Sequence, residues 1–334
     1  MTTESNISVI GAGAWGTALA IQLARNGKET LLWGRDPSQV EKMEAARLNA
    51  RYLPDAPFPE RLRVTADLAL AVSGQRDLLV VVPSHTFRSV LGQIRPHLRP
   101  DSRIIWATKG LEMDSGKFLH QVVAEELGTE MPAAIVAGPS FATELGKGQP
   151  TAMTAASHKA DYIPDVVAFF HGQNLRMYTS EDVLGMEIGG AVKNVLAIAA
   201  GISDGLGFGA NARVALITRG LAELMRLGVA LGAKQETLMG LSGVGDLVLT
   251  CTDNQSRNRR LGLALGQGKT LEEATAEIGQ ALEGVKTASV INHVASEAGV
   301  EMPISTDVHR ILHEGLSPRA AVAELLNREL KTEF

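Results

Sequence analysis

Lys193 is the only cation in the run VLGMEIGGAVKNVLAIAAGI at residues 183–202, whose other residues are typical of a buried helix. Burial lowers the pKa of a lysine, and such a lysine can take or donate a proton near neutral pH. Gly189 and Gly190 lie one helical turn earlier, so bare backbone is expected beneath the side chain, where a small molecule could approach. We predict that Lys193 is a general acid or base. The alternative is a structural lysine, with its amine in solvent or paired with Glu187, although helical spacing places Glu187 on another face.

Three glycines with the spacing GxGxxG, Gly11, Gly13 and Gly16, stand between a β-rich run and a helical run. Gly11 permits a tight turn, Gly13 lets the backbone approach a pyrophosphate, and Gly16 lets the helix pack on the strand. The motif alone is weak, and an ordinary strand-to-helix turn is the alternative. Its position between strand and helix favours a dinucleotide-binding loop.

The end of the second expected strand decides which dinucleotide is preferred, and here the chain reads Trp33-Gly34-Arg35-Asp36. An arginine at this place can bind a 2′-phosphate, whereas an acid binds the ribose hydroxyls. Because Arg35 comes first, we expect NADP(H) to be preferred and NAD(H) to be tolerated. A solvated Arg35 without a role is the alternative.

Polar residues also follow two later strands of the expected sheet. Lys109 in TKGLE and Ser140 in AGPSFATEL stand at the carboxyl ends of these strands, the edge at which open α/β sheets bind ligands. Either residue alone could be structural, Lys109 as a surface lysine and Ser140 as a helix cap. Their repetition at adjacent strand ends favours a binding site.

A glycine-rich stretch at residues 240–262 carries Asp246, Thr250 and the cluster Ser256-Arg257-Asn258-Arg259-Arg260. Serine, arginine and asparagine at the start of a helix favour a bound phosphate, and a solvated basic patch is the alternative. Asp246 could cap a helix or could hold Lys193 in position.

No metal site is predicted. His309 and His313 have the i, i+4 spacing of a helical metal pair, but a third ligand and the glutamate of HExxH are missing, so we interpret both as solvated side chains. The single cysteine, Cys251, excludes an internal disulfide and is expected to be a small buried hydrophobe.

The elements that must position these residues fall into two parts. Short β-rich runs alternate with helical stretches up to about residue 180, which predicts an α/β domain with a mostly parallel, doubly wound sheet. The expected strands are residues 7–11, 29–34, 77–83, 103–108 and 134–138, with 151–157 and 174–180 as extensions at the sheet edge. The expected later helices are residues 183–202, 210–232, a stretch from Arg259, 270–279, 287–299 and 317–330. We therefore divide the chain into a dinucleotide-binding domain at 1–190 and an all-α substrate-binding domain at 191–334.

Bulk properties exclude some classes of partner. The formal net charge of −5 argues against nucleic acid or an anionic membrane as the main partner. The amino terminus lacks the basic flank and long apolar core of a signal peptide, and charged residues interrupt the run at 183–202. We expect a soluble, cytoplasmic protein without a membrane span.

The chain resembles the bacterial NAD(P)-dependent glycerol-3-phosphate dehydrogenases essentially from end to end. The resemblance rests on GAGAWGTALA, LWGRDP, VVVPS, ATKGLE, AGPSFATEL, EIGGAVKNVLAIAAGISDGLGFGANARVALITRGLAE, GLSGVGDLVLTC with SRNRRLG, and ALEGVKTA. It implies a Rossmann domain followed by an all-helical domain, with the active site between them. A homodimer is expected from the family alone.

The resemblance also implies a role for each matching residue. Besides the three glycines, cofactor contacts would come from Ala14, Trp15, Arg35, Lys109, Ala142, Arg257, Ala281 and Glu283. Substrate contacts would come from Lys109, Gly138, Ser140, Lys193, Asp246, Thr250, Ser256, Arg257 and Asn258. Lys193 corresponds to the proton-transferring lysine of the family.

The implied reaction is the reversible NAD(P)H-dependent reduction of dihydroxyacetone phosphate to sn-glycerol 3-phosphate, which feeds glycerophospholipid biosynthesis. Lys193 would donate the proton, Lys109 would add positive charge near the oxygen, and Asp246 would orient Lys193. Two alternatives stay open. A dehydrogenase of a 3-hydroxy acid has no need of Arg257 for a phosphate, and a non-catalytic NADPH-binding sensor has no use for Lys193.

Overall fold

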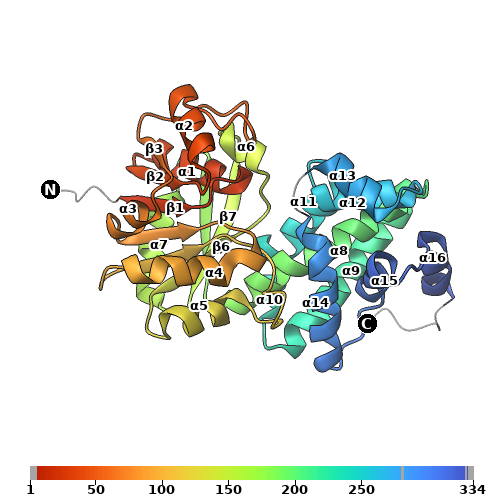
Figure 1. Cartoon of the computed structure of the whole chain (residues 1–334). Coiled ribbons are helices and arrows are strands. Elements are labelled where there is room, and N and C mark those ends of the chain that lie inside the picture. Colours follow the sequence, from red (N-terminus) through yellow and green to blue (C-terminus); the bar gives the residue numbers. More distant parts are fainter. Residues whose placement is uncertain (1–5, 280–281, 328, 330–334) are drawn as a thin grey trace. The chain divides into compact units, whose positions relative to one another are not determined.

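The computed structural model of the chain describes residues 6–279, 282–327 and 329. The chain divides into two compact units, Met1–Glu187 and Ile188–Phe334. In the described ranges all strands belong to the first unit, and the second unit consists of helices, drawn in green and blue in Figure 1. The predicted fold class, a doubly wound α/β domain followed by an all-α domain, is confirmed.

The first unit is built on one eight-stranded sheet in the order β3-β2-β1-β4-β5-β6-β7-β8. The strands are β1 (Ile7–Ile10), β2 (Thr30–Trp33), β3 (Leu62–Thr65), β4 (Asp77–Val80), β5 (Arg103–Trp106), β6 (Ala133–Ala137), β7 (Thr151–Ser157) and β8 (Leu175–Ser180). All neighbouring pairs are parallel except β6 and β7. The order of β1 to β6 is that of dinucleotide-binding sheets, which bind their ligand where the strand order reverses, beside β1 and β4.

The two strands expected at the sheet edge are present, because β7 pairs with β6 and β8 pairs with β7. Strand β3 was not among the expected strands. Of its four residues only Leu62 is buried, and Arg63 is exposed. A short strand at the other edge of the sheet therefore carries no apolar run that the sequence could reveal.

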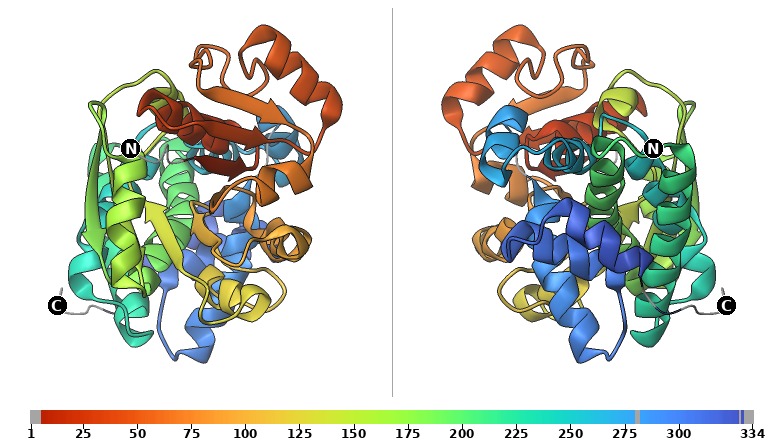
Figure 2. Two further views of the ribbon diagram at one scale, coloured as in Figure 1. Left: turned by 90° about the vertical axis from the view of Figure 1, so that its left-hand side faces the viewer. Right: turned by 90° about the vertical axis from the view of Figure 1, so that its right-hand side faces the viewer.

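Helices cover both faces of the sheet. In the first unit they are α1 (Ala14–Arg25), α2 (Pro37–Ala46), α3 (Leu68–Ser73), α4 (Ser84–Ile94), α5 (Leu119–Leu127), α6 (Ala142–Gly146) and α7 (Ile163–Phe170), with short 3-10 turns at Arg95–His97 and Ala160–Tyr162. Leu79 of β4 packs with residues of α1, α6 and α7, whereas Leu78 and Val80 pack with residues of α3, α4 and α5. The left view of Figure 2 shows helices on both sides of the strands. Burial on both faces of the sheet explains why the central strands β1 and β4 are buried along their whole length.

The helical unit begins within α8 (Val183–Gly205), which crosses the boundary between the units. Its other helices are α9 (Ala210–Ala230), α10 (Gln235–Leu238), α11 (Asp246–Thr252), α12 (Arg257–Gly266), α13 (Leu271–Ile278), α14 (Glu283–Glu297), α15 (Pro303–His313) and α16 (Pro318–Leu326), with a π-helical turn, η3, at Leu241–Gly245. The right view of Figure 2 faces these helices. The list of expected helices lacks α15, although the spacing of its two histidines is helical.

The helix α8 forms the core of this unit. Its length and mean hydropathy of 1.5 would suit a membrane span, but 94% of that stretch is buried inside the fold. In the part of the chain that the structure describes it is the one helix of this kind. Its burial is that of a core helix.

The backbones of α8 and α12 touch. A Cβ atom on Gly201 would lie 2.0 Å from the carbonyl oxygen of Arg259, and one on Gly262 would lie 2.0 Å from that of Ile198. Gly205 and Gly266 repeat the arrangement one turn later along each helix. Small residues four apart permit such an approach, so α12 has one fixed position against the helix that carries Lys193.

Candidate active site

The glycine loop joins β1 to α1. Gly11 has a φ of 124°, and a Cβ atom there would lie 2.3 Å from the carbonyl oxygen of Val81, so only glycine fits this turn. A Cβ on Gly16 would lie 1.9 Å from the carbonyl oxygen of Gly11, which shows how closely helix and strand pack. Around Gly13 a Cβ atom would meet nothing within 4 Å. The loop therefore leaves open space at Gly13, beside the first turn of a twelve-residue helix whose amides can bind a phosphate.

Residues outside the motif hold this loop in place. Ala14 and Trp15 begin α1, and the indole nitrogen of Trp15 donates to the carbonyl oxygen of Ala107 at 3.2 Å. Asn49, which is fully buried, donates to the carbonyl oxygen of Ala12 at 3.1 Å and to Thr17 Oγ1 at 2.9 Å. Asn49 was not predicted, because nothing around it in the chain distinguishes it from a surface asparagine.

Arg35 and Asp36 follow β2 and differ in what they do. Asp36 is the N-cap of α2 and accepts hydrogen bonds from the backbone amides of Ser38 and Gln39 at 3.0 and 3.4 Å. Arg35 is exposed at the end of the strand. The carboxylate is therefore engaged by its own helix, while the guanidinium is accessible to a phosphate.

The sheet brings three of the predicted residues together at the ends of β5 and β6. Lys109 Nζ donates to the carbonyl oxygen of Gly138 at 3.4 Å, and Ser140 Oγ donates to the same oxygen at 3.1 Å. The N-cap of α6 is Phe141, so Ser140 is not the cap of that helix. Ala142 is the first residue of α6. A cation and a hydroxyl thus share one strand edge.

The helical unit contains a buried charged pair. Lys193 Nζ lies 2.6 Å from Asp246 Oδ1 and donates to Thr250 Oγ1 at 3.1 Å. The side chains of Lys193 and Asp246 are 7% and 1% exposed. Asp246 therefore holds Lys193, one of the two roles considered for it. Glu187, the partner considered in the alternative, instead binds the ring and the backbone amide of His120.

The expectation of open backbone beneath Lys193 was wrong at Gly189. A Cβ atom on Gly189 would lie 2.2 Å from the carbonyl oxygen of Ser242. The turn η3 therefore occupies the space that we expected a small molecule to reach. Ser242 is more than fifty residues away in the chain, and helical spacing alone carries no information about such a contact.

The predicted phosphate cluster lies at the start of α12. Ser256 is the N-cap, and its hydroxyl accepts from the backbone amide of Arg259 at 3.2 Å. Arg257 is exposed, whereas Asn258 is buried. The side chain of Asn258 donates to Asn194 Oδ1 at 3.0 Å and accepts from the backbone amide of Gly284 at 3.2 Å. Asn258 therefore also joins α8, α12 and α14, a role that the sequence analysis did not foresee.

Two further cofactor contacts, Ala281 and Glu283, were predicted near the start of α14. Glu283 is the first residue of that helix, and its carbonyl oxygen accepts from Thr287 Oγ1 at 2.8 Å. Ala281 lies outside the described residues.

Of the two histidines of α15, His313 is exposed, as expected, whereas His309 is partly buried. The ring of His309 lies 3.2 Å from Ser289 Oγ, with 17% of its side chain exposed, so it is not the solvated residue that we expected. His313 Nε2 lies 3.0 Å from the carbonyl oxygen of Val285. Within the described ranges, no group of three or more His, Cys, Asp or Glu side chains could hold a metal ion.

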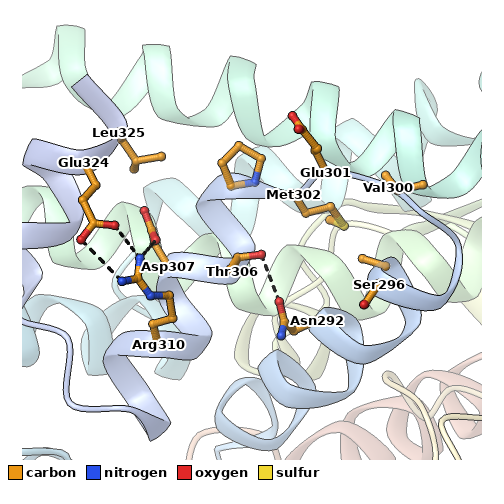
Figure 3. Close-up of a pocket in the computed structure, with 12 residues that line it drawn as sticks. Asn292, Ser296, Val300, Glu301, Met302, Thr306, Asp307, Arg310, Glu324 and Leu325 are labelled. Carbon is orange, nitrogen blue, oxygen red and sulfur yellow. Dashed lines mark hydrogen bonds and ion pairs between the residues drawn. The ribbon is translucent and has the colours of Figure 1, made fainter. Parts of the chain in front are cut away.

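A cavity of about 540 Å³ lies among α14, α15 and α16 (Figure 3). In its wall Arg310 binds Asp307 and Glu324, and Thr306 donates to Asn292 at 3.0 Å. None of the predicted site residues lines this cavity. It is therefore distinct from the candidate active site.

The sheet order, the glycine loop and the buried lysine–carboxylate pair define the chain as a dinucleotide-dependent oxidoreductase with a separate helical unit. Residues 6–163 match the family described as the N-terminus of NAD-dependent glycerol-3-phosphate dehydrogenase, and residues 182–323 match the family described as its C-terminus. The chain belongs to the NAD-dependent glycerol-3-phosphate dehydrogenase family, as its resemblance predicted.

Individual relatives agree over their full length. The glycerol-3-phosphate dehydrogenase [NAD(P)+] of Thioalkalivibrio sulfidiphilus is 60% identical over 99% of this chain and 100% of the relative. That of Aeromonas hydrophila is 56% identical over 100% of both chains. The crystal structure of the glycerol-3-phosphate dehydrogenase of Coxiella burnetii has a TM-score of 0.94 and 50% identity, and the match covers 97% of this chain and 99% of that chain.

Proposed function

We propose that the chain catalyses the reversible NAD(P)H-dependent reduction of dihydroxyacetone phosphate to sn-glycerol 3-phosphate, a precursor of glycerophospholipids. The relatives named above support the reaction through their names and their full-length identity. The observation that carries the proposal is the Lys193–Asp246 pair, because a ketone reduction needs a proton donor and this pair holds one in a dry, fixed place.

We assign cofactor binding to residues 1–190 and substrate binding to residues 191–334. The loop from Gly11 to Gly16 would hold the pyrophosphate, and the open space at Gly13 fits that group. Both NADP(H) and NAD(H) serve as cofactors, and the exposed Arg35 beside a capping Asp36 supports a preference for NADP(H). The remaining cofactor contacts would be Ala14, Trp15, Lys109, Ala142, Arg257, Ala281 and Glu283.

A bound nicotinamide would supply a hydride to the carbonyl carbon, and the π electrons of the carbonyl would pass to its oxygen. Lys193 would donate a proton from its ammonium to that oxygen and be left as the neutral amine. Asp246 and Thr250 fix the direction in which the ammonium points. Lys109 adds positive charge near the oxygen and, with Gly138 and Ser140, contacts the substrate.

The phosphate of the substrate would be held by Ser256, Arg257 and Asn258. They begin a ten-residue helix, and the amides at its first turn favour an anion there. Arg257 offers a guanidinium that matches phosphate geometry. Binding energy from the phosphate then places the ketone for reaction.

We further infer a cytoplasmic homodimer that needs neither nucleic acid nor membrane. The family is the main support for the dimer. Size-exclusion chromatography with light scattering tests the dimer, and a monomer at micromolar concentration would contradict it.

The first experiment is NADPH oxidation by the purified protein with dihydroxyacetone phosphate, beside unphosphorylated dihydroxyacetone as the control. Turnover with the phosphate alone is the expected result, since the phosphate ligands of α12 have no partner on the control substrate. Absence of turnover with either compound would leave the hydroxy-acid dehydrogenase and the sensor as the interpretations.

A further inference from the structure

Arg259 is a buried cation that belongs to none of the roles assigned above. It lies in the first turn of α12 with 7% of its side chain exposed. Its Nε donates to the carbonyl oxygen of Cys251 at 3.0 Å, its Nη1 donates to Asn254 Oδ1, and its Nη2 pairs with Asp204 Oδ2. One guanidinium thus binds the end of α11, the connection that directly follows it, and the end of α8.

Each of these segments leads to a part of the candidate site. Cys251 is on α11, the helix that presents Asp246 and Thr250 to Lys193. Asn254 lies in the short connection that leads from α11 to the N-cap Ser256. Asp204 lies in the last turn of α8, three turns beyond Lys193 on the same helix. The contacts of Arg259 therefore join the segments that carry the proton donor and the phosphate ligands.

The backbone at Arg259 is fixed as well. Its carbonyl oxygen lies where α8 and α12 touch at Gly201, and its amide donates to Ser256 Oγ at 3.2 Å. The first turn of α12 consequently cannot slide along α8 while the side chain holds the end of α11. The connection at residues 253–256 spans the gap between two fixed ends.

A charged pair is an expensive way to fill this space. Removing two charges from water costs free energy that offsets much of their mutual attraction. An apolar contact of similar size could therefore give equal stability. The planar fork of a guanidinium, however, sets the directions of several hydrogen bonds at once. The arrangement around Arg259 is therefore better suited to fixing geometry than to adding stability.

We propose that Arg259 is a positioning residue that sets the spacing between the proton donor Lys193 and the phosphate ligands Ser256 and Arg257. The inference rests on the proposed function. In dihydroxyacetone phosphate the ketone and the phosphate are separated by one carbon, so a site that binds both ends must hold its two sets of ligands at one distance. Arg259 would fix that distance through its contacts with α8, α11 and the connection at residues 253–256, without touching the substrate.

The test compares Arg259→Lys with Arg213→Lys. A lysine at 259 keeps the charge and can reach Asp204, but it cannot bind Cys251, Asn254 and Asp204 together. We expect KM for dihydroxyacetone phosphate to rise about tenfold to a hundredfold, because small displacements of binding groups have effects of this size. KM for NADPH should rise less than that, because Arg257 is only one of its proposed contacts, and the pH profile of kcat, which reports the proton donor, should not change.

Arg213 is the matched control. It lies on α9 and pairs with the same oxygen, Asp204 Oδ2, at 2.8 Å, but its side chain is 30% exposed and, among the described residues, this pair joins only α8 and α9. Arg213→Lys should leave KM for dihydroxyacetone phosphate within about twofold, as for an exposed ion pair. An equal rise in both variants would contradict the proposal, because it would assign the effect to Asp204 alone.

Cys251 reports whether the variant remains folded, since it is the single cysteine, is fully buried and bonds to Arg259 through its own carbonyl. A raised KM while Cys251 stays protected from a thiol reagent supports positioning. A lowered kcat with unchanged KM, or an unchanged KM, overturns it. If Arg259→Lys does not fold, Asn254→Ala removes one of the three contacts and should raise the same KM by a smaller factor. Wild-type protein that does not turn over dihydroxyacetone phosphate would instead reject the proposed function.

Discussion

Lys193 Nζ lies 2.6 Å from Asp246 Oδ1, in a place where both side chains are almost fully withdrawn from solvent. The attraction between an ammonium and a carboxylate is strong in such a place, because little water screens the two charges. Thr250 accepts a further hydrogen bond from the ammonium and itself donates to the carbonyl oxygen of Asp246 at 2.6 Å. Asp246 and Thr250, both on α11, thus fix the orientation of the Lys193 ammonium.

Lys193→Met should lower kcat by about a hundredfold to ten-thousandfold, the usual effect of losing a general acid. The NADPH dissociation constant should not change, because Lys193 is not among the proposed cofactor contacts. Steady-state kinetics and fluorescence titration measure the two effects. Lys147→Met is the control, since Lys147 is a half-exposed lysine paired with Asp55 on the surface. Near-normal turnover in Lys193→Met would show that the proton comes from elsewhere.

Arg35→Ala should raise KM for NADPH about tenfold or more and leave KM for NADH nearly unchanged, because only NADPH carries the 2′-phosphate that Arg35 would bind. The ratio of kcat/KM for the two cofactors measures the effect. Arg63→Ala, at an exposed arginine of β3, is the control. If the ratio stayed the same in Arg35→Ala, the preference would have to be set by another residue.

Features that depend on the spacing of residues close together in the chain could be predicted from the sequence. The glycine motif after an apolar run placed the loop at β1, and the charge in an apolar helix selected Lys193. The alternation of β-rich runs with helical stretches and the resemblance together predicted the class of fold. Strand β3 was not predicted, because only one of its residues is buried.

Contacts between residues that lie far apart in the chain could not be predicted from local spacing. The backbone of Ser242 occupies the space beside Gly189. Asn258 belongs to the predicted phosphate cluster, but it also forms hydrogen bonds with Asn194 and Gly284. Arg259 looked like one more residue of a basic string, yet it is buried and holds three segments. The sequence of a single chain gives the type of these side chains but not what the fold places beside them.

Gly262→Ala should destabilise the helical unit by about 1–3 kcal/mol or more, since overpacking at a backbone contact cannot relax through a side chain. The added Cβ would lie 2.0 Å from the carbonyl oxygen of Ile198 on α8. Gly92→Ala on α4 is the matched control, because a Cβ there meets nothing within 4 Å. It should stabilise its helix by about 0.5–1 kcal/mol. Urea unfolding of both variants measures the free energies, and equal stabilities would contradict the close contact.

Glu223 should make stability depend on pH. Burial raises the pKa of its carboxyl above the ordinary value of 4.5, while its oxygens accept from the backbone amides of Ile304 and Ser305. A group whose pKa is raised by folding contributes stability below its unfolded pKa and loses it as the pH rises through the folded pKa. Glu223→Gln is neutral at every pH and can still accept one of these bonds. Its free energy of unfolding, relative to wild type, should therefore rise from pH 4.5 towards neutrality, and parallel curves would exclude the effect.

Cys251 should react with a thiol reagent only when the helical unit opens. The side chain is fully buried, and burial raises the pKa of its thiol to about 12, although the charges of Lys193 and Arg259 act in the opposite direction. At pH 8 we expect no labelling of native protein by iodoacetamide within minutes, and one label per chain in guanidinium chloride. The pH dependence separates two routes. Reaction through an open state should level off above about pH 8.5, the ordinary pKa of a cysteine. A rate that continued to rise towards pH 12 would mean that the reagent reaches the thiol within the folded unit, and the packing around α11 would then be looser than its contacts with Arg259 indicate.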